Sequence, residues 1–378
     1  MKKKVQRKMR YVIMYFVAVL AVLVSNFFAY DLEILLKLRP KIHKSDSTQV
    51  HFIDVGQGDA IAIKLSNGET MLVDSGISDY RSKLTTYLDN VIIKNNTLDH
   101  LVLTHPDIDH SSNIEYILKK YNVKNFYRPR IFASNEDNTP KCYNPTYDSI
   151  IDSLSSFDTQ VKFHSDLTII DENVSVVCLD VLDMYESLED LDTNQFSPII
   201  IISDNGKKVM LTGDISSETE EKFIEKYPTS ALDIDILKLA HHGSKYSTSE
   251  LFLKVTSPDY VVATVGENSY GHPANDTLAR LVAYDQKYDK STFATLKSTL
   301  SDGNIVYTLD QDITINEIDN IDNYNFTSYF VYSIIVETIL VYFYLKPYFY
   351  VWKRNIRFYV QNRRYEKNKE KENNKIGK

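Results

Sequence analysis

The sequence predicts an α/β fold in which two stacked β-sheets are covered by helices, together with membrane-spanning helices at both ends of the chain. Three observations support this prediction. Apolar strands alternate with amphipathic helices across residues 50–309. Runs of twenty almost uncharged residues lie near both ends of the 378-residue chain. Three of the predicted strands end in His or Asp side chains.

The elements follow from apolar, β-branched runs that are separated by turn residues and by helical periodicity. Asn67-Gly68 and Asp204-Asn205-Gly206 are hairpin turns between apolar runs. We expect strands at residues 50–55, 60–65, 70–74, 101–104, within 168–182, and at 198–203, 207–213, 234–240, 259–265 and near 292–309. We expect helices at residues 79–95, after Ser112, and near 216–226, 247–256 and 274–284. No domain boundary interrupts residues 31–325.

Composition and charge exclude several classes of protein. Hydrophobic residues make up 43% and charged residues 25% of the chain, which excludes a disordered, collagenous or wholly membrane-embedded protein. The net charge of −8 is uneven, because residues 11–345 hold 26 Lys/Arg against 48 Asp/Glu, a net of −22. A protein surface with this excess of acidic residues binds the phosphates of long DNA poorly, because such binding depends on Lys and Arg.

The Lys/Arg-rich segments at both ends of the chain are typical of the cytoplasmic parts of a membrane protein. Residues 11–30 carry no charge and are long enough to span a bilayer, after residues 1–10 with six Lys/Arg. The alternative is a cleaved signal peptide, but the run is longer than a usual apolar signal region. Lys/Arg favour the cytoplasmic side, so we expect residues 31–325 to face outward from a bacterial-type cell membrane.

A second apolar run occupies residues 326–345, with one charge at Glu337. Aromatic residues and cations follow it, as at a lipid headgroup interface, and residues 346–378 form a basic tail with eleven Lys/Arg. We expect a second span with both termini cytoplasmic; the alternative is an amphipathic helix lying on the membrane. Cys142 and Cys178 are the two cysteines, and their spacing does not decide whether they pair.

Three motifs carry the chemistry, each directly after a predicted strand. The first, residues 104–110, reads Thr-His-Pro-Asp-Ile-Asp-His; the second places Asp214 after a strand; the third is His241-His242-Gly243. Without a Cys-x-x-Cys pair, a metal here needs His and carboxylate ligands. We expect an extended turn at the first motif and a carboxylate-bridged site for two metals where the three strand ends meet.

These motifs resemble those of the metallo-β-lactamase superfamily, most of all the hydrolase-like domain of ComEC-type competence (DNA-uptake) proteins. The resemblance rests on residues 54–60, 72–76, 105–110, 211–214, 241–244 and 266–273. It implies an αββα sandwich with the site between the sheet edges. It also implies one or two divalent metal ions, zinc first and manganese as the alternative.

The resemblance also implies roles for individual residues. The metal ligands would be His105, Asp107, Asp109, His110, Asp214 and His242. Asp214 would bridge, and Asp59 and Asp74 would support the ligands. Asp109, His241 and His272 are the catalytic candidates; His272 would reach the leaving group or a phosphate oxygen, or else has only a structural role. Because adjacent residues at a strand end point to opposite sides, we expect only one of His241 and His242 to face the metals.

Two departures from the family pattern matter. Asp107 stands where a histidine is usual in the wider superfamily, and residues 193–197 contain no histidine where a further ligand is expected. His164 lies too far upstream to replace it. The channel of the competence proteins is missing, so DNA transport is not implied.

We therefore expect a membrane-anchored, outward-facing metallo-hydrolase that cleaves phosphodiesters. The first substrate class is single-stranded or short nucleic acid, or a nucleotide. The alternatives are a phosphorylcholine or teichoic-acid type of phosphodiesterase, and a degenerate, non-catalytic binding or sensor module.

Overall fold

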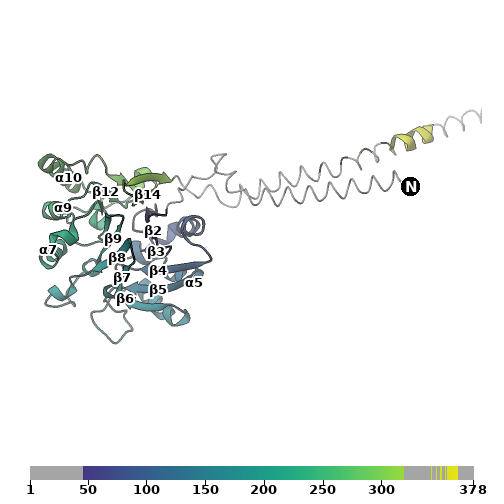
Figure 1. The fold of residues 1–378 in the computed structure, drawn as a ribbon. Coiled ribbons are helices and arrows are strands. Elements are labelled where there is room, and N and C mark those ends of the chain that lie inside the picture. The colour runs from purple at the N-terminus through teal and green to yellow at the C-terminus, as the bar shows by residue number, and fades with distance from the viewer. Residues whose placement is uncertain are drawn as a thin grey trace, which may run out of the picture. The chain divides into compact units, whose positions relative to one another are not determined.

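The computed structural model describes residues 46–318 and, near the C-terminus, positions 342, 346, 350, 354 and 356–364. Residues Ile42–Asp322 form one compact unit (Figure 1). Residues 1–41 and 323–378 form a second unit, in which residues 356–364 are helical. The predicted spans at residues 11–30 and 326–345 lie outside the described residues, apart from position 342. No helix among the described residues has both the length and the apolar composition needed to cross a membrane.

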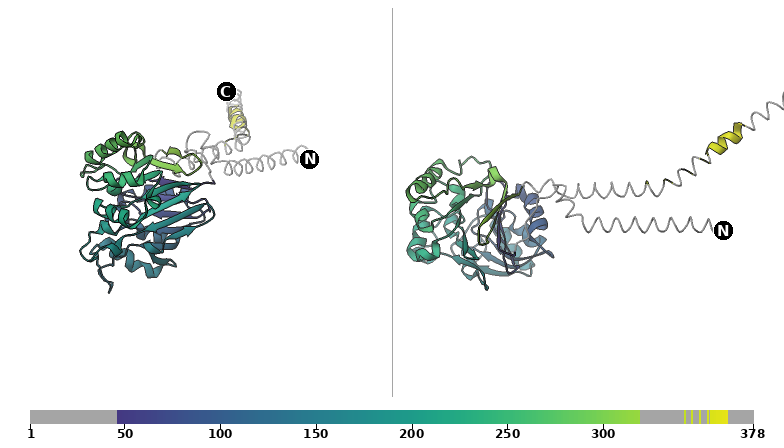
Figure 2. Two further views of the ribbon diagram at one scale, coloured as in Figure 1. Left: turned by 60° about the vertical axis from the view of Figure 1, so that its left-hand side comes forward. Right: turned by 45° about the horizontal axis from the view of Figure 1, so that its top comes forward.

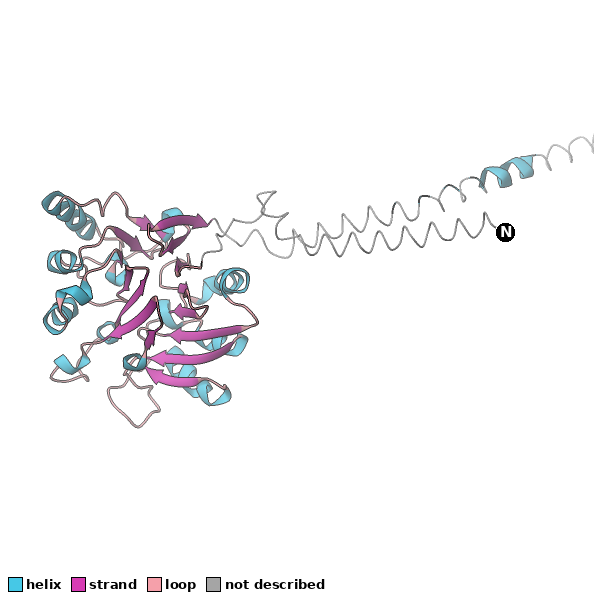
Figure 3. Ribbon diagram, viewed as in Figure 1, coloured by secondary structure: helices cyan, strands magenta, loops and turns pink. Residues whose placement is uncertain are grey.

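Two β-sheets form the centre of the unit Ile42–Asp322, and helices lie on their outer faces (Figures 1 and 3). The first sheet has eight strands in the order β15-β14-β1-β2-β3-β4-β5-β6, and the second has seven in the order β13-β12-β11-β10-β9-β8-β7. Figure 2 shows the same layers from two other directions. The αββα architecture predicted from the sequence is therefore confirmed.

The strands of the first sheet are β1 (Gln49–Phe52), β2 (Ile61–Lys64), β3 (Thr70–Val73), β4 (Thr97–Val102), β5 (Asn122–Arg128), β6 (Gln160–Phe163), β14 (Asn304–Thr308) and β15 (Thr314–Ile318). Those of the second sheet are β7 (Thr168–Ile170), β8 (Val174–Leu179), β9 (Ile199–Asp204), β10 (Lys207–Leu211), β11 (Ile236–Lys238), β12 (Tyr260–Ala263) and β13 (Lys297–Ser298). The α-helices are α3 (Arg81–Tyr87), α4 (Ile108–Ser111), α5 (Ile114–Lys120), α6 (Pro145–Ser153), α7 (Ser217–Lys226), α8 (Thr229–Leu232), α9 (Glu250–Thr256), α10 (Asn275–Tyr288) and α11 (Thr299–Asp302).

The apolar pattern of β9 shows how the two layers of core are built. Its four isoleucines are all buried, but successive side chains enter different clusters. Ile200 and Ile202 join the core between the two sheets, whereas Ile199 and Ile201 join the core under the helices. A strand that is covered on both faces therefore reads as a continuous apolar run rather than as an alternation.

Several elements differ from the sequence prediction. The helix expected at residues 79–95 is α3 followed by a wider π-helical turn, Leu88–Ile92. Strands β5 and β6 and helix α6 were not predicted, because they lie in a polar stretch with weak periodicity. Cys142 and Cys178 are both free thiols, and no disulfide joins them.

Parallel pairing places the ends of the chemically important strands at one edge. In the first sheet β3 runs parallel to β4, with Val73 opposite Val102. In the second sheet β11 runs parallel to β10 and to β12, with Leu237 opposite Met210 and Val261. Because the carboxyl ends of parallel strands meet at the same edge, the loops after β3, β4, β10, β11 and β12 converge.

Candidate metal centre

Four side chains from three of these loops bring one ligand atom each to a single point. They are Asp109 and His110 after β4, Asp214 after β10, and His242 after β11. The Nε2 atom of His242 lies 3.3 Å from the Nε2 atom of His110, and 3.3 Å from Oδ2 of both Asp214 and Asp109. The Nε2 atom of His110 also lies 3.3 Å from Oδ2 of Asp214.

These distances fit a tetrahedral metal site. Bonds of about 2.0–2.1 Å to zinc place the corners of a regular tetrahedron about 3.3–3.4 Å apart, because the edge is about 1.6 times the bond. Two imidazole nitrogens and two carboxylate oxygens that meet at these separations are ligand atoms of the types that bind zinc and similar metals. The donor set therefore fits a divalent cation.

The electrostatics of this cluster favour positive charge. Burial by itself lowers the pKa of His110, but the carboxylates of Asp214, Asp74 and Asp109 raise it well above the usual value. The pKa of His242 is raised in the same way, against its burial, chiefly by Asp214. Burial raises the pKa of Asp109, yet the neighbouring histidines lower it to about 2. The carboxylate is thus ionised and available as a ligand.

A layer of buried groups behind the ligands orients the histidines. His110 Nδ1 donates to Oδ2 of Asp74 at 2.8 Å, and His242 Nδ1 donates to the carbonyl oxygen of Thr264 at 2.8 Å. These bonds leave both Nε2 atoms free for a metal, as is usual for ligating histidines. The hydrogen bond from His110 agrees with the expectation that Asp74 supports the ligands, whereas nothing in the pattern of the sequence indicates Thr264.

Lys238 is a fully buried lysine in this layer. Its Nζ lies 2.8 Å from Oδ2 of Asp59 and 3.9 Å from Oδ1 of Asp214. Burial lowers the pKa of Lys238, but Asp59 and Asp214 raise it above the usual value, so the ammonium stays charged. Sequence reasoning missed this residue, although a lysine inside an apolar strand is a usable signal, because a buried charge needs a partner.

Gly58 explains why the loop after β1 lies so close to the ligands. A Cβ atom at Gly58 would lie 2.2 Å from the carbonyl oxygen of Asp109, and its φ of +133° is unfavourable for other residues. The next residue, Asp59, donates its backbone N–H to that same oxygen at 3.2 Å. The glycine-rich segment therefore supports the loop that carries Asp109 and His110.

The first motif does not form the expected extended turn. The backbone enters helix α4 at Ile108, so Asp109 and His110 lie on a helical turn while His105 and Asp107 precede it. His105 Nε2 lies 3.7 Å from Oδ2 of Asp107 and has no hydrogen-bond partner among the described residues. Oδ1 of Asp214 is also buried without a hydrogen bond among the described residues, and together with His105 and Asp107 it forms an incomplete second position.

Hydroxyl groups contact both residues of this second position. Thr193 Oγ1 donates to Oδ1 of Asp107 at 2.7 Å, and Ser197 Oγ lies 3.2 Å from Nδ1 of His105. His164 does not approach the site as a ligand, since its Nε2 donates to the carbonyl oxygen of Leu103. The structure thus brings together one set of four ligands and a weaker set of two beside it.

His241 and His242 differ in exposure because of a tight turn and not because of strand alternation. Both have left-handed backbone angles, with φ of +50° at His241 and +56° at His242, so the expected extended geometry is wrong. This turn buries His242 among the ligands and leaves the side chain of His241 34% exposed, with Nε2 3.8 Å from Oδ2 of Asp214. Such strained backbone is concentrated at functional sites.

An open cavity of about 510 Å³ lies beside the ligands, three of which line it. Its wall includes Asp107, Asp109 and Asp214 together with His241, His242 and His272. Burial, and then the charges of His241 and His242, lower the pKa of His272. The remaining wall residues are Gln57, Ile77, Ile108 and Tyr270, so no lysine or arginine of the described residues lines this cavity.

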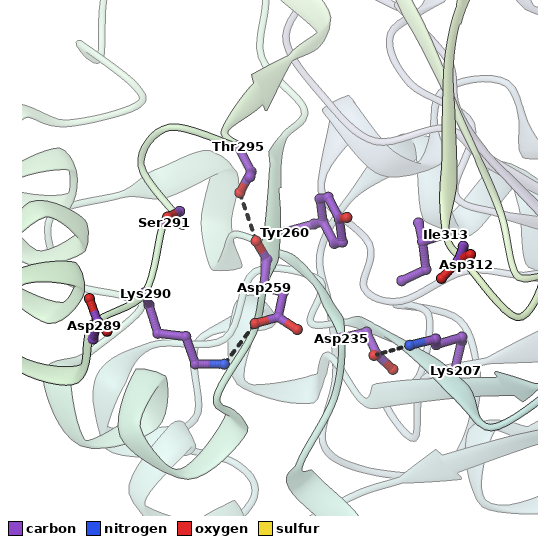
Figure 4. Close-up of a pocket in the computed structure, with 10 residues that line it drawn as sticks. All are labelled: Lys207, Asp235, Asp259, Tyr260, Asp289, Lys290, Ser291, Thr295, Asp312 and Ile313. Atoms are coloured by element: carbon purple, nitrogen blue, oxygen red, sulfur yellow. Dashed lines mark hydrogen bonds and ion pairs between the residues drawn. The ribbon is translucent and has the colours of Figure 1, made fainter.

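A second cavity of about 400 Å³ lies at the opposite ends of β11 and β12 (Figure 4). Asp235 and Asp259, which directly precede these strands, are paired with Lys207 at 3.4 Å and with Lys290 at 2.7 Å. Among the described residues, no histidine lines it. Both of its lysines are paired with carboxylates, so the chemistry of the molecule is expected at the histidine-lined cavity.

The chain is similar to several known proteins. Residues 53–175 match the sequence model of the metallo-beta-lactamase superfamily. The chain is 28% identical over 258 residues to ComE operon protein 3 of Bacillus subtilis, covering 63% of this chain and 31% of that protein. It is 29% identical over 243 residues to Recombination protein 2 of Haemophilus influenzae, covering 62% and 26%.

A third relative is Competence protein ComA of Neisseria gonorrhoeae, which is 25% identical over 250 residues and covers 66% of this chain and 32% of that protein. The chain thus spans about a third or less of these relatives. Among solved structures, a diphosphatase of the PhnP family has a TM-score of 0.37 at 12% identity, covering 68% of this chain and 97% of that one. The short form of human tRNase Z has a TM-score of 0.34 at 15% identity, covering 57% and 91%.

Proposed function

We propose that this chain, which carries a metallo-β-lactamase superfamily domain and is similar to competence proteins, is a metal-dependent phosphodiesterase. The observation that carries the proposal is the set of four ligand atoms, of whose six separations four are 3.3 Å, beside an open cavity that three of the ligand residues line. A divalent metal held there supplies Lewis-acid activation of water and neutralises charge on phosphoryl oxygens.

The chain's own residues have distinct roles in this proposal. Asp109, His110, Asp214 and His242 would hold the metal. Asp107 lines the cavity beside them, and the buried His105 lies next to Asp107. His241 is partly exposed beside Asp214 and, when protonated, donates a proton to the leaving oxygen. His272 is kept neutral by its lowered pKa and binds a phosphoryl or leaving-group oxygen through a ring N–H.

The substrate that suits this cavity is a nucleotide or a short nucleic acid. Residues 46–318 contain 43 Asp/Glu and 22 Lys/Arg, a net charge of −21. Because long nucleic acids are bound chiefly by basic side chains along their phosphates, this surface and the cavity without cations favour a substrate that presents few phosphates.

We also propose that the domain is anchored in a membrane and faces outward. This part rests on composition alone: the uncharged residues 11–30, the nearly uncharged residues 326–345, and the Lys/Arg-rich segments outside both.

The test compares two adjacent histidines in the full chain, with bis-p-nitrophenyl phosphate as substrate. His242→Ala should remove bound metal and hydrolysis together, because it removes a ligand. His241→Ala should keep the metal and slow turnover by about 10²–10⁴-fold, the usual contribution of a general acid.

His164→Gln serves as the control, since this histidine hydrogen-bonds to backbone away from the ligands, and it should keep both metal and turnover. Loss of metal in His241→Ala alone would reverse the two assignments. Unchanged turnover in both variants would refute the proposed mechanism.

A further inference from the structure

Tyr270 is an exposed aromatic side chain in the wall of the histidine-lined cavity. It is 77% exposed, and its ring lies 5.9 Å from the ring of His272, at an angle of 31° between the planes. Ile108, between Asp107 and Asp109, is 60% exposed in the same wall. Large apolar surface that is left open beside reactive groups indicates a binding surface.

The turn that presents Tyr270 is held in place by hydrogen bonds. The side-chain amide of Asn268 donates to the carbonyl oxygens of Gly266 and His272, at 2.9 and 3.0 Å, and its oxygen accepts the backbone N–H of His272 at 3.0 Å. Ala274 N–H donates to the carbonyl oxygen of Gly243 at 2.8 Å, which ties the turn to the loop of His242. The ring of Tyr270 is therefore exposed on a loop that hydrogen bonds hold in one conformation.

The chemistry of the cavity wall limits what this ring can bind. The wall offers carboxylates, histidines and apolar groups, and within the described part of the chain it includes no lysine or arginine that would hold further phosphates. The part of a substrate next to the scissile phosphate must then gain affinity by contact with apolar and aromatic surface. A flat, uncharged heterocycle meets this requirement, since every nucleobase has a π-face that stacks on aromatic side chains.

We propose that Tyr270, together with Ile108, forms a stacking platform for the nucleobase of a nucleoside attached to the scissile phosphodiester. The inference rests on the proposed phosphodiesterase function and adds a specificity-determining residue to it. Tyr270 selects a nucleoside over a simple alkyl group, while the metal ligands act on the phosphate that both share.

Two esters with the same leaving group test this selectivity in the metal-loaded full chain. They are thymidine 5′-(p-nitrophenyl phosphate), which carries a base, and methyl p-nitrophenyl phosphate, which does not. Tyr270→Ala should lower kcat/KM for the thymidine ester by about 5- to 150-fold, as expected for the loss of one stacked base, and change the methyl ester by less than about twofold. Metal content should not change.

Matched variants separate stacking from other effects. Tyr270→Phe keeps the ring and should retain the preference for the thymidine ester. Phe293→Ala removes an exposed aromatic beside Asp285, outside the cavity wall, and should change neither ester. An equal loss for both esters in Tyr270→Ala, no loss for either, or a Tyr270→Phe variant as impaired as Tyr270→Ala would overturn the proposal.

Binding distinguishes a failure of this inference from a failure of the proposed function. Calorimetry should show that the zinc-loaded chain binds thymidine 5′-monophosphate more tightly than methyl phosphate, and that Tyr270→Ala abolishes the difference. If the chain hydrolyses neither ester but shows this difference in binding, the platform stands and the phosphodiesterase function fails. If it hydrolyses both esters without preference, the function stands and the platform fails.

Discussion

His110→Ala is the sharpest perturbation of the proposed metal centre. The Nε2 atom of His110 is one corner of the four-ligand set, 3.3 Å from both the His242 nitrogen and the Asp214 oxygen. Alanine removes this corner and leaves three ligands, two of them carboxylates. His105→Ala is the matched control, because His105 belongs to the incomplete second position and is equally buried.

The size of the effect follows from linkage between metal binding and folding. Loss of a group that merely supports a ligand weakens metal binding about 10–100-fold, so loss of the ligand itself should weaken it by at least about 100-fold. At a zinc concentration about 100 times the dissociation constant of the wild type, bound metal stabilises the native state by about 2.7 kcal/mol. At the same concentration the variant should gain only about 0.4 kcal/mol or less.

The assay is denaturant unfolding of the full chain with and without zinc, together with the metal content of the purified protein. Wild type and His105→Ala should show the full stabilisation by zinc, and His110→Ala should show almost none. If His110→Ala kept the stabilisation, or if His105→Ala lost it, the assignment of the tight site to the four ligands would be wrong.

Three further predictions concern the support of the ligands, the response to pH and the topology. Asp74→Asn should weaken metal binding about 10–100-fold in a metal titration, because it replaces the carboxylate that accepts the His110 N–H, whereas wild-type affinity would show that this bond has no role. Burial lowers the pKa of His164 from 6.5 to about 4. As the pH falls, the unfolded chain therefore binds a proton at this histidine before the folded chain does, and the free energy of unfolding decreases between about pH 6.5 and 4. His164→Gln should reduce that loss by about 3 kcal/mol in unfolding measured across this range, and an unchanged pH profile would contradict it. A reporter fused near residue 45 should be extracytoplasmic and one after Lys378 cytoplasmic; an external C-terminus would eliminate the second span.

Local patterns in the sequence predicted the layers of the fold and the types of ligand. Apolar runs such as residues 198–203 and 207–213 formed strands close to their expected bounds, because burial of a whole strand requires an apolar run and Asn205-Gly206 favours the hairpin turn between them. The polar residues after strands β4, β10 and β11 could be identified because each directly follows an apolar run that predicts a strand. These signals depend on near neighbours in the chain.

The tertiary structure alone decided which of these side chains share one point in space. His110 and His242 are separated by 132 residues, and their 3.3 Å contact depends on how the two sheets stack. The left-handed turn at His241 and His242, and the hydroxyls of Thr193 and Ser197 beside Asp107 and His105, could not be predicted from strand alternation, because each depends on packing between distant loops. The residue types specify the chemistry, and long-range packing determines the geometry in which that chemistry operates.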